Sequence, residues 1–325
     1  MRLQSCSAIL IVGGAVAALA ACQQPKPGPA PGALLAWAYP HGPKTPLPSY
    51  PAGALHVPGS KVTYTGEVLN KGDVQPDWFP RSHPPAPQIV DKGRDGVICA
   101  ECHRIGGDGY MGTVDLAGLK ADYIIQQVHE FRAGRRHSWE ANREATSEMI
   151  KVAQRVSDAD LQAAAAYYAS LPRKAHVRVI EGDTAPASRP NYYGWTDRVP
   201  GQPPRPLKGQ VVEVAEDEAR MLLADPNSPL LVYAPTGSKA RGQALVRSGG
   251  PNGQACGSCH GPALQGSTIA PPLAGRSAAY LARQLLDIKT GARGGPAVAQ
   301  MQGPARDLSD EQIRDIAVYA ASLNP

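Results

Sequence analysis

The sequence predicts an all-α protein in which one helical domain occurs twice in tandem, with proline-rich irregular segments before and between the copies. Three observations lead to this. A stretch of the chain repeats at a constant offset, each copy closes with a helix-start signal, and the remaining segments are dense in proline and glycine. At about 150 residues per domain, the length of 325 residues also predicts two domains. We place them at residues 86–172 and 236–325.

The N-terminus has the pattern of an export signal. Arg2 precedes an apolar run from Ala8 to Ala21, about 14 residues, which is too short to span a bilayer and typical of a signal-peptide core. The run ends in Leu19-Ala20-Ala21-Cys22, which resembles the lipobox of bacterial lipoproteins. Residues 1–21 are therefore predicted to be a removed signal and Cys22 the lipidated N-terminus, with Gln23 favouring the outer membrane. The alternative is an ordinary signal peptide that ends beside an unrelated cysteine.

Two segments outside the repeat are predicted to be largely irregular. Within residues 22–85, the stretch 23–48 is dense in Pro, Gly and Ala, so that we expect an extended tether that buries no core. Residues 173–235 form the interdomain connection. Short elements are expected in both: a strand at 62–65, a loop packed on the first domain at 76–80, a strand at 211–214 and a helix at 216–223.

An internal repeat organises the rest of the chain. Adding 157 to the residue number carries Cys99, Cys102 and His103 onto Cys256, Cys259 and His260. Five residues are extra in the first copy after Arg136, and the offset is then 152. Further matches are Leu116–Gly118 with Leu273–Gly275, Tyr123 with Tyr280, Gln127 with Gln284, Arg136 with Arg293, Met149 with Met301 and Ser157 with Ser309. One fold is therefore expected twice.

Each copy is predicted to end in a helix that begins at a capping serine. Ser157 is followed three residues later by Asp160, and Ser309 by Gln312. In this pattern the two side chains satisfy free N–H groups of the first helical turn. Pro172 ends the first of these helices, because proline cannot continue the hydrogen-bond ladder.

A further helix is expected before each cysteine pair. In the second copy Ser238 is predicted to cap a helix that runs to about Arg247. Gly93 and Gly242 are predicted to lie where two helices cross closely, because a glycine costs helix stability unless the contact needs it.

The motifs Cys99-Ala100-Glu101-Cys102-His103 and Cys256-Gly257-Ser258-Cys259-His260 both read CxxCH, the attachment signature of c-type haem. This spacing lets both thiols reach the vinyl groups on one edge of the porphyrin, and it places the histidine beneath the iron. We therefore predict two covalently attached haem c groups, bound through Cys99, Cys102, Cys256 and Cys259, with His103 and His260 as iron ligands. The alternatives are a thioredoxin-like redox pair and half of a zinc site.

This scheme accounts for all six cysteines. Cys6 leaves with the signal, Cys22 takes lipid, and the other four form thioethers. None remains for a disulfide, although an oxidising compartment would otherwise pair free thiols. Phenylalanine occurs only twice, and a buried haem supplies the apolar contact area that aromatic side chains would otherwise provide.

The second axial ligand of each iron is predicted to be a methionine. Met149 and Met301 share one register of the repeat, 8 residues before Ser157 and Ser309, on segments that we expect to be irregular. A methionine is more often a core filler than a ligand, but the repeat favours the ligand role here. Met111, His129 and His137 compete in the first copy. Of these His137 is the stronger rival, because Met111 and His129 match Thr268 and Leu286 in the second copy.

With these motifs in place, both copies resemble class I cytochrome c domains, and the tandem resembles di-haem periplasmic cytochromes. The family pattern implies Pro-x-Leu-Ala-Gly after the haem motif, with the proline carbonyl accepting a hydrogen bond from the proximal histidine. Pro271-Pro272-Leu273-Ala274-Gly275 fits, whereas the first copy has Val114-Asp115 before Leu116, which leaves a carbonyl without the rigidity of proline. Arg136 and Arg293 are candidates for neutralising haem propionates, and Gln127 and Gln284 for lining the haem crevice or the contact between domains. Solvated helix-surface roles are an equal alternative for these four.

The predicted function is a periplasmic electron carrier that passes single electrons between redox proteins and is held to a bacterial membrane by its lipid. The donor is expected to be a quinol-oxidising complex or a dehydrogenase, and the acceptor an oxidase or reductase. Two alternatives stay open: a di-haem peroxidase-type enzyme with one open haem, and a cytochrome subunit of a periplasmic dehydrogenase. Nucleic acid is not expected as a partner, because the net charge is only +5 and the basic residues form no tract.

Overall fold

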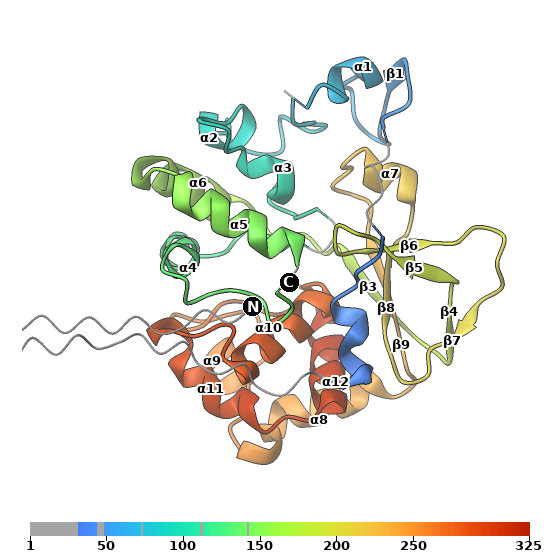
Figure 1. The fold of residues 1–325 in the computed structure, drawn as a ribbon, viewed down its shortest axis with the longest axis vertical. Helices are drawn as coiled ribbons and strands as arrows, with labels where there is room; N and C mark the ends of the chain where they lie inside the picture. Colours follow the sequence, from blue (N-terminus) through green and yellow to red (C-terminus); the bar gives the residue numbers. More distant parts are fainter. Residues whose placement is uncertain (1–31, 44–48, 73, 111–112, 142) are drawn as a thin grey trace, which may run out of the picture.

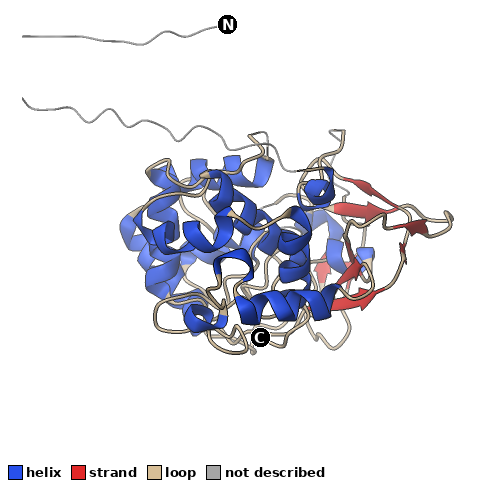
Figure 2. Ribbon diagram, turned by 90° about the horizontal axis from the view of Figure 1, so that it is seen from below, coloured by secondary structure: helices blue, strands red, loops and turns tan. Residues whose placement is uncertain are grey.

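The computed structural model describes residues 32–43, 49–72, 74–110, 113–141 and 143–325. In Figure 1 the helices of the first repeat lie above those of the second, and the strands between them in the sequence lie to the right. Figure 2 shows these strands gathered at one end, with helices filling the rest. Within the described ranges, no helix is long and apolar enough to cross a membrane.

The first domain is a small helical bundle. Its elements are α2 (Gln88–Asp91), α3 (Cys99–His103), α4 (Ala121–Arg132), α5 (Glu144–Arg155) and α6 (Asp158–Ser170). The core forms where α4, α5 and α6 face one another. Val90, Ala153, Ala165 and Tyr168 are almost entirely buried there.

The second domain repeats this order, with a longer first helix and two short 3-10 helices added. Its elements are α8 (Ser238–Ser248), η2 (Gly250–Asn252), α9 (Gly257–His260), α10 (Ala278–Thr290), η3 (Pro296–Val298), α11 (Ala299–Arg306) and α12 (Asp310–Ala321). Leu286, Ile313 and Ala317 lie in its core, almost fully buried. The short helix with the CxxCH motif, α3 or α9, precedes the long helix α4 or α10 in each copy.

The two predicted capping serines are confirmed. The Ser157 side chain accepts a hydrogen bond from the Asp160 backbone N–H at 3.1 Å, and α6 ends just before Pro172. At Ser309 both halves of the capping box form: its hydroxyl accepts from the Gln312 N–H, and the Gln312 side chain accepts from the Ser309 N–H at 2.8 Å. Both helices therefore begin where the sequence indicates.

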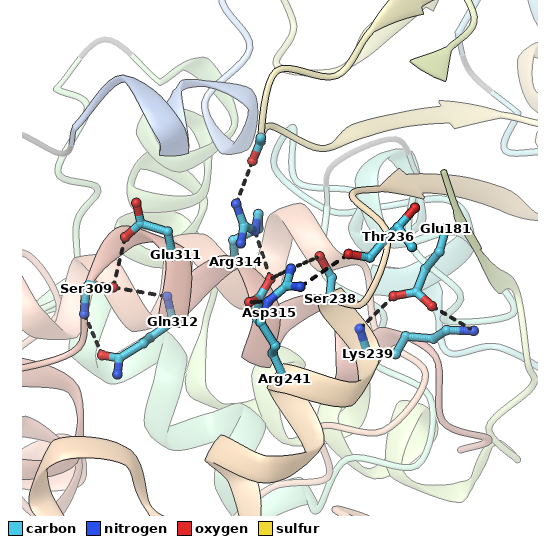
Figure 3. A network of polar contacts seen from close by, with 11 residues as sticks. Glu181, Thr236, Ser238, Lys239, Arg241, Ser309, Glu311, Gln312, Arg314 and Asp315 are labelled. Atoms are coloured by element: carbon cyan, nitrogen blue, oxygen red, sulfur yellow. Dashed lines mark hydrogen bonds and ion pairs between the residues drawn. The ribbon is translucent and has the colours of Figure 1, made fainter. Parts of the chain in front are cut away.

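The close crossing predicted at Gly242 is confirmed. A Cβ at this position of α8 would lie 2.0 Å from the Asp315 carbonyl oxygen of α12. Beside the crossing, the Arg241 guanidinium donates to the Asp315 carboxylate at 2.6 Å and Arg314 donates to the same group (Figure 3). The predicted helix is present as Ser238–Ser248, but the expectation that Ser238 caps it is wrong: Ser238 is its first residue, and the N-cap is Gly237 in a left-handed conformation.

The crossing predicted at Gly93 is wrong. Gly93 follows the four-residue helix α2 and has φ +77°, so that it forms a turn that other residues rarely adopt. A Cβ there would meet the backbone and side chain of the next few residues, not a second helix. In the first copy the helix before the cysteine pair is therefore short and has no glycine crossing, although α2 packs on α6 as α8 packs on α12.

The interdomain segment folds into more than the predicted strand and helix. The strand appears as β8 (Val212–Ala215) and the helix as α7 (Glu218–Leu222). Two further strands, β3 (Val177–Glu181) and β9 (Leu230–Ala234), complete a three-stranded sheet in the order β3-β9-β8, with β3 and β9 parallel. This sheet packs on the second domain through Val211, Val232, Ala278 and Val318. Small antiparallel pairs join β4 (Thr184–Ala185) to β7 (Arg205–Pro206) and β5 (Ser188–Pro190) to β6 (Thr196–Arg198).

The segment before the first domain is also more ordered than predicted. Residues of the expected tether form η1 (Ala33–Ala38), in which Leu35 and Ala38 are fully buried in the core of the second domain. The Ala38 carbonyl accepts from Arg283 at 2.8 Å, and the Tyr39 hydroxyl donates to Asp287 at 3.1 Å. The expectation of a coreless tether is wrong for these residues.

Residues 49–85 pack around a tryptophan. The elements here are β1 (Ala54–Leu55), β2 (Tyr64–Thr65) and α1 (Gly66–Leu69), so that the predicted strand at 62–65 is present but shorter. Trp78 is 2% exposed and its indole N–H donates to the Leu223 carbonyl at 2.6 Å. The predicted loop at 76–80 therefore packs on the end of α7, and it is also joined to the first domain, because the His83 ring lies 3.1 Å from both the Asp77 carboxylate and the Tyr167 hydroxyl.

Candidate haem sites

Each CxxCH motif forms a short helix that presents its two thiols together. Cys99, Cys256 and Cys259 are half-buried, Cys102 is exposed, and all four are free thiols. The loop that follows α3 is held by α6, because the Tyr168 hydroxyl donates a hydrogen bond to the Arg104 carbonyl at 3.1 Å. The Tyr168 ring also meets the His103 ring edge-on, with the centroids 6.3 Å apart.

Both motif histidines have the same ring orientation and protonation pattern. His103 Nδ1 lies 3.0 Å from the Val114 carbonyl oxygen, and His260 Nδ1 lies 2.8 Å from the Pro271 carbonyl oxygen. A carbonyl only accepts hydrogen bonds, so Nδ1 carries the proton and Nε2 keeps its lone pair. Burial lowers the pKa of both imidazoles, which keeps them neutral. This is the state in which histidine binds a metal through Nε2.

A large apolar cavity opens in front of His260. Most of the residues that line it are apolar, as is usual for pockets that take a small molecule or cofactor. Cys256, Cys259 and His260 line it on one side, and Met301 of α11 also lines it. The first domain contributes Leu119 and Tyr123. His260 Nε2 is buried and has no hydrogen-bond partner among the described residues.

Met149 and Met301 both lie on helices, α5 and α11, and the expectation of irregular segments is wrong. Met149 packs half-buried against the first-domain core, and so does Cys99. Each methionine faces the interior of its domain. The two residues that match in the sequence repeat therefore also occupy corresponding positions in the two domains.

The rival residues lie elsewhere. His129 is on the surface of α4, with Nε2 3.9 Å from the Asp158 carboxylate. His137 lies at the contact between domains, where its Nδ1 is 2.9 Å from the Ala292 carbonyl oxygen. Met111 lies outside the described residues, as does the predicted lipidation site Cys22.

Two buried arginines meet at the contact between the domains. The backbones of Arg136 and Arg293 pair as an antiparallel bridge, and their guanidinium groups share the Gln127 and Gln284 side-chain oxygens at 2.8–3.1 Å. Within the described part of the chain, neither guanidinium has a carboxylate within 4 Å, and Arg293 Nε has no partner. Burial and the neighbouring Arg293 lower the pKa of Arg136. Two buried cations without a counter-ion are costly, so the arrangement fits anionic groups at this place.

A second polar contact joins the domains, and the sequence alone did not reveal it. Arg276 of the second domain binds Asp115 of the first, and both are buried. Asp115 stands where the second copy has Pro272, and Arg276 where the first copy has Leu119. The signal in the sequence that could have indicated this contact is that the two copies differ at both positions.

The alternative of a zinc site gains no support from the side chains that surround the cysteine pairs. Among residues with a described placement, no three His, Cys, Asp or Glu side chains gather as a metal-binding group. Each pair instead faces a cavity or core lined by apolar residues and one histidine, which suits a large apolar cofactor.

Comparison with known proteins identifies the family. The cytochrome c family model matches residues 93–172 and 240–324. Cytochrome c4 of Pseudomonas aeruginosa is 28% identical over 70% of this chain and 85% of its own length. A protein of Stutzerimonas stutzeri named thiosulfate dehydrogenase electron acceptor is 27% identical over 70% of this chain and 79% of its own. The crystal structure of reduced cytochrome c4 from Pseudomonas stutzeri is 24% identical over 69% of this chain and 93% of its own, with a TM-score of 0.42.

The matches cover both repeats, and they confirm the predicted tandem of helical domains, the two covalently bound haem c groups and the role of electron carrier. The small interdomain sheet is an addition to the helical fold. The chain belongs to the cytochrome c family, as a tandem di-haem electron-transfer cytochrome.

Proposed function

We propose that Cys99 and Cys102 hold one haem through thioether bonds and that Cys256 and Cys259 hold the other, with His103 and His260 as the proximal iron ligands. The observation that carries the proposal is the pair of hydrogen bonds from histidine Nδ1 to the Val114 and Pro271 carbonyls. These bonds orient each ring and direct the Nε2 lone pair away from the backbone. The unpartnered, buried Nε2 of His260 supports the same role.

Met149 and Met301 are proposed as the second axial ligands. Met301 lines the same cavity as His260, and Met149 occupies the matching register in the first domain. With both axial positions filled by side chains, small molecules are kept from the iron, which suits electron transfer rather than a reaction at the metal. Bound haem supplies one-electron exchange between the ferric and ferrous states, and the protein sets the potential at which this occurs.

The buried arginine pair is proposed to neutralise haem propionates. Arg136 and Arg293 bring two positive charges into the contact between domains, where their side-chain hydrogen-bond partners among the described residues are two glutamine amides and the Tyr123 hydroxyl. Anionic propionates from the haems would provide the missing counter-charge. The two cofactors would then share one electrostatic environment, which favours electron passage between them.

The protein is proposed to act on the periplasmic side of a bacterial membrane, anchored by lipid on Cys22. The N-terminal sequence supports export, and the likeness to proteins named thiosulfate dehydrogenase electron acceptor supports a periplasmic dehydrogenase as the donor. A quinol-oxidising complex is the second donor to test, and an oxidase or reductase is the expected acceptor. The segments 49–85 and 173–235 lie outside the family match and supply surface for such partners.

Absorption spectroscopy of the oxidised holoprotein tests the ligand assignment. Methionine-ligated ferric haem has a sulfur-to-iron charge-transfer band, and we expect Met149→Leu and Met301→Leu each to remove about half of its intensity. Met221→Leu is the control for loss of another buried methionine: Met221 is 3% exposed, lies in α7, and its sulfur accepts a hydrogen bond from Arg104 at 3.0 Å. An unchanged band in Met149→Leu would contradict the assignment for the first haem and favour His137.

Carbon monoxide binding separates the carrier from an enzyme with an open haem. We expect the reduced wild-type protein to bind carbon monoxide slowly and incompletely, because two side chains occupy each iron. Rapid binding of one equivalent per chain would contradict the proposed six-coordinate sites.

A further inference from the structure

Arg276 and Asp115 form a buried ion pair between the two domains, beside both histidine loops. The two residues are 2% and 7% exposed. Arg276 Nη1 donates to the Asp115 backbone carbonyl at 2.7 Å and also to its carboxylate. Arg276 Nε donates to the Pro272 carbonyl at 2.7 Å. One guanidinium therefore joins a loop of the first domain to a loop of the second.

These two loops are the ones that orient the proximal histidines. Asp115 directly follows Val114, whose carbonyl accepts from His103, and Pro272 directly follows Pro271, whose carbonyl accepts from His260. In the second domain two successive prolines fix the backbone φ angles at this place. In the first domain Val114 and Asp115 have no such restriction, although the carbonyl has the same task.

We propose that Arg276 is a positioning residue for the proximal ligand of the first haem. By holding the Asp115 backbone, it fixes the Val114 carbonyl and replaces the rigidity that the prolines give to the second domain. The first domain gives no equivalent support to the second, because Leu119 occupies the position in the first copy that corresponds to Arg276. The inference rests on the proposed ligation of the first iron by His103.

The physical consequence concerns the potential of the first haem. A carbonyl held in place keeps the His103 Nδ1–H hydrogen-bonded, which raises the electron donation of the ring to the iron and stabilises the ferric state. A looser carbonyl weakens this bond, so the potential of the first haem rises. Because Arg276 belongs to the second domain, docking of that domain sets the potential of the first haem.

The test variant is Arg276→Lys in the holoprotein. Lysine keeps the positive charge, which matters because Arg276 also lines the cavity of the second domain, but an ammonium group lacks the planar fork that reaches both loops. The first readout is a redox titration that resolves the two haems. The second is NMR spectroscopy, which measures how fast the Nδ1–H proton of each proximal histidine exchanges with deuterium. These protons have hyperfine-shifted signals, and the variants Met149→Leu and Met301→Leu assign each signal to one haem.

We expect Arg276→Lys to raise the potential of the first haem more than that of the second. His103 Nδ1–H exchange should become about tenfold faster, the effect of weakening roughly one hydrogen bond, while His260 exchange stays within about twofold of wild type. Asp115→Asn keeps the backbone acceptor but loses the carboxylate charge that pairs with Arg276 and, at 3.8 Å, with Arg173, so its His103 exchange should be intermediate. That variant tests the proposal if Arg276→Lys does not fold.

Arg314→Lys is the matched control. Arg314 is a buried arginine of the same domain that also binds a carboxylate and a carbonyl, those of Asp315 and Gly209, each at 2.8 Å (Figure 3). It contacts neither histidine loop and should leave both exchange rates unchanged. His103 exchange at the wild-type rate in Arg276→Lys, or equal acceleration at both histidines, overturns the proposal. A wild-type spectrum without two such Nδ1–H signals instead overturns the proposed histidine ligation itself, and the role of Arg276 falls with it.

Discussion

Replacement of Gly242 by alanine tests how the second haem domain is held together. Gly242 lies where α8 crosses α12, and a Cβ would be 2.0 Å from the Asp315 carbonyl oxygen and 2.7 Å from Tyr319 Cβ. Contacts below about 3 Å force a shift, and here the obstacle is backbone rather than the end of a flexible side chain. The two helices must therefore move apart, which also loosens the apolar contacts that they share.

The magnitude follows from two opposing effects. Alanine in place of glycine favours a helix by about 0.5–1 kcal/mol. Overpacking of a closely packed contact costs about 1–3 kcal/mol, and a rigid backbone obstacle places this case at the upper end. We expect a net loss of about 2 kcal/mol in the free energy of unfolding. For a domain of this size that lowers Tm by about 10 °C.

Denaturant and thermal unfolding of the holoprotein, followed by circular dichroism, measure this loss. Gly303→Ala is the matched control, because Gly303 also lies inside a helix, α11, but nothing lies within 4 Å of its added Cβ. The control should be neutral or slightly stabilising. If Gly242→Ala unfolds at the same temperature as Gly303→Ala, the close crossing of α8 and α12 is refuted.

Three further substitutions test other parts of the account. Leu35→Ala should cost about 2–5 kcal/mol, because Leu35 is fully buried in the second-domain core; equality with wild type in a denaturant melt would show that η1 is not docked. Ser309→Ala should cost about 1 kcal/mol through loss of the capping box of α12, and an unchanged unfolding midpoint would contradict that cap. Trp78→Phe leaves the Leu223 carbonyl without its donor and should lower the free energy of unfolding by about 1–3 kcal/mol, measured by far-ultraviolet circular dichroism. An unchanged free energy of unfolding would mean that the 2.6 Å hydrogen bond contributes nothing.

Features governed by local chemistry were predictable from the sequence. The capping serines act within one helical turn, so their position in the sequence was enough to place the starts of α6 and α12. The carbonyl partners of His103 and His260 are close in the sequence and followed from the resemblance to class I cytochrome c domains. The cofactor class followed from the spacing of two thiols and a histidine.

Features governed by contacts between distant segments were not predictable. Leu35 lies in a stretch whose composition is typical of a tether, and only the apolar face of the second domain explains its burial. The strands β3 and β9 pair across about 50 residues of sequence, and short strands of this kind leave a weak local pattern. Gly93 and Gly242 look alike in the sequence, yet one forms a turn and the other a helix crossing.

The pairing of Arg276 with Asp115 belongs to the same class. Each residue alone has the composition of a solvated surface position, and neither has a match in the other copy. Their burial follows from docking of one domain on the other, which no periodicity within a single domain encodes. The carbonyl partner of each CxxCH histidine was therefore predictable within its domain, whereas the helices that carry Met149 and Met301 and the link between the domains were not.

The intact mass of the mature protein, produced with a working haem-attachment system, tests the central claim most directly. We expect the mass of the polypeptide plus two haem groups, retained after denaturation because the bonds are thioethers. Cys256→Ala combined with Cys259→Ala should lower the count to one. A mass that includes no haem, together with no haem absorption, would contradict the account.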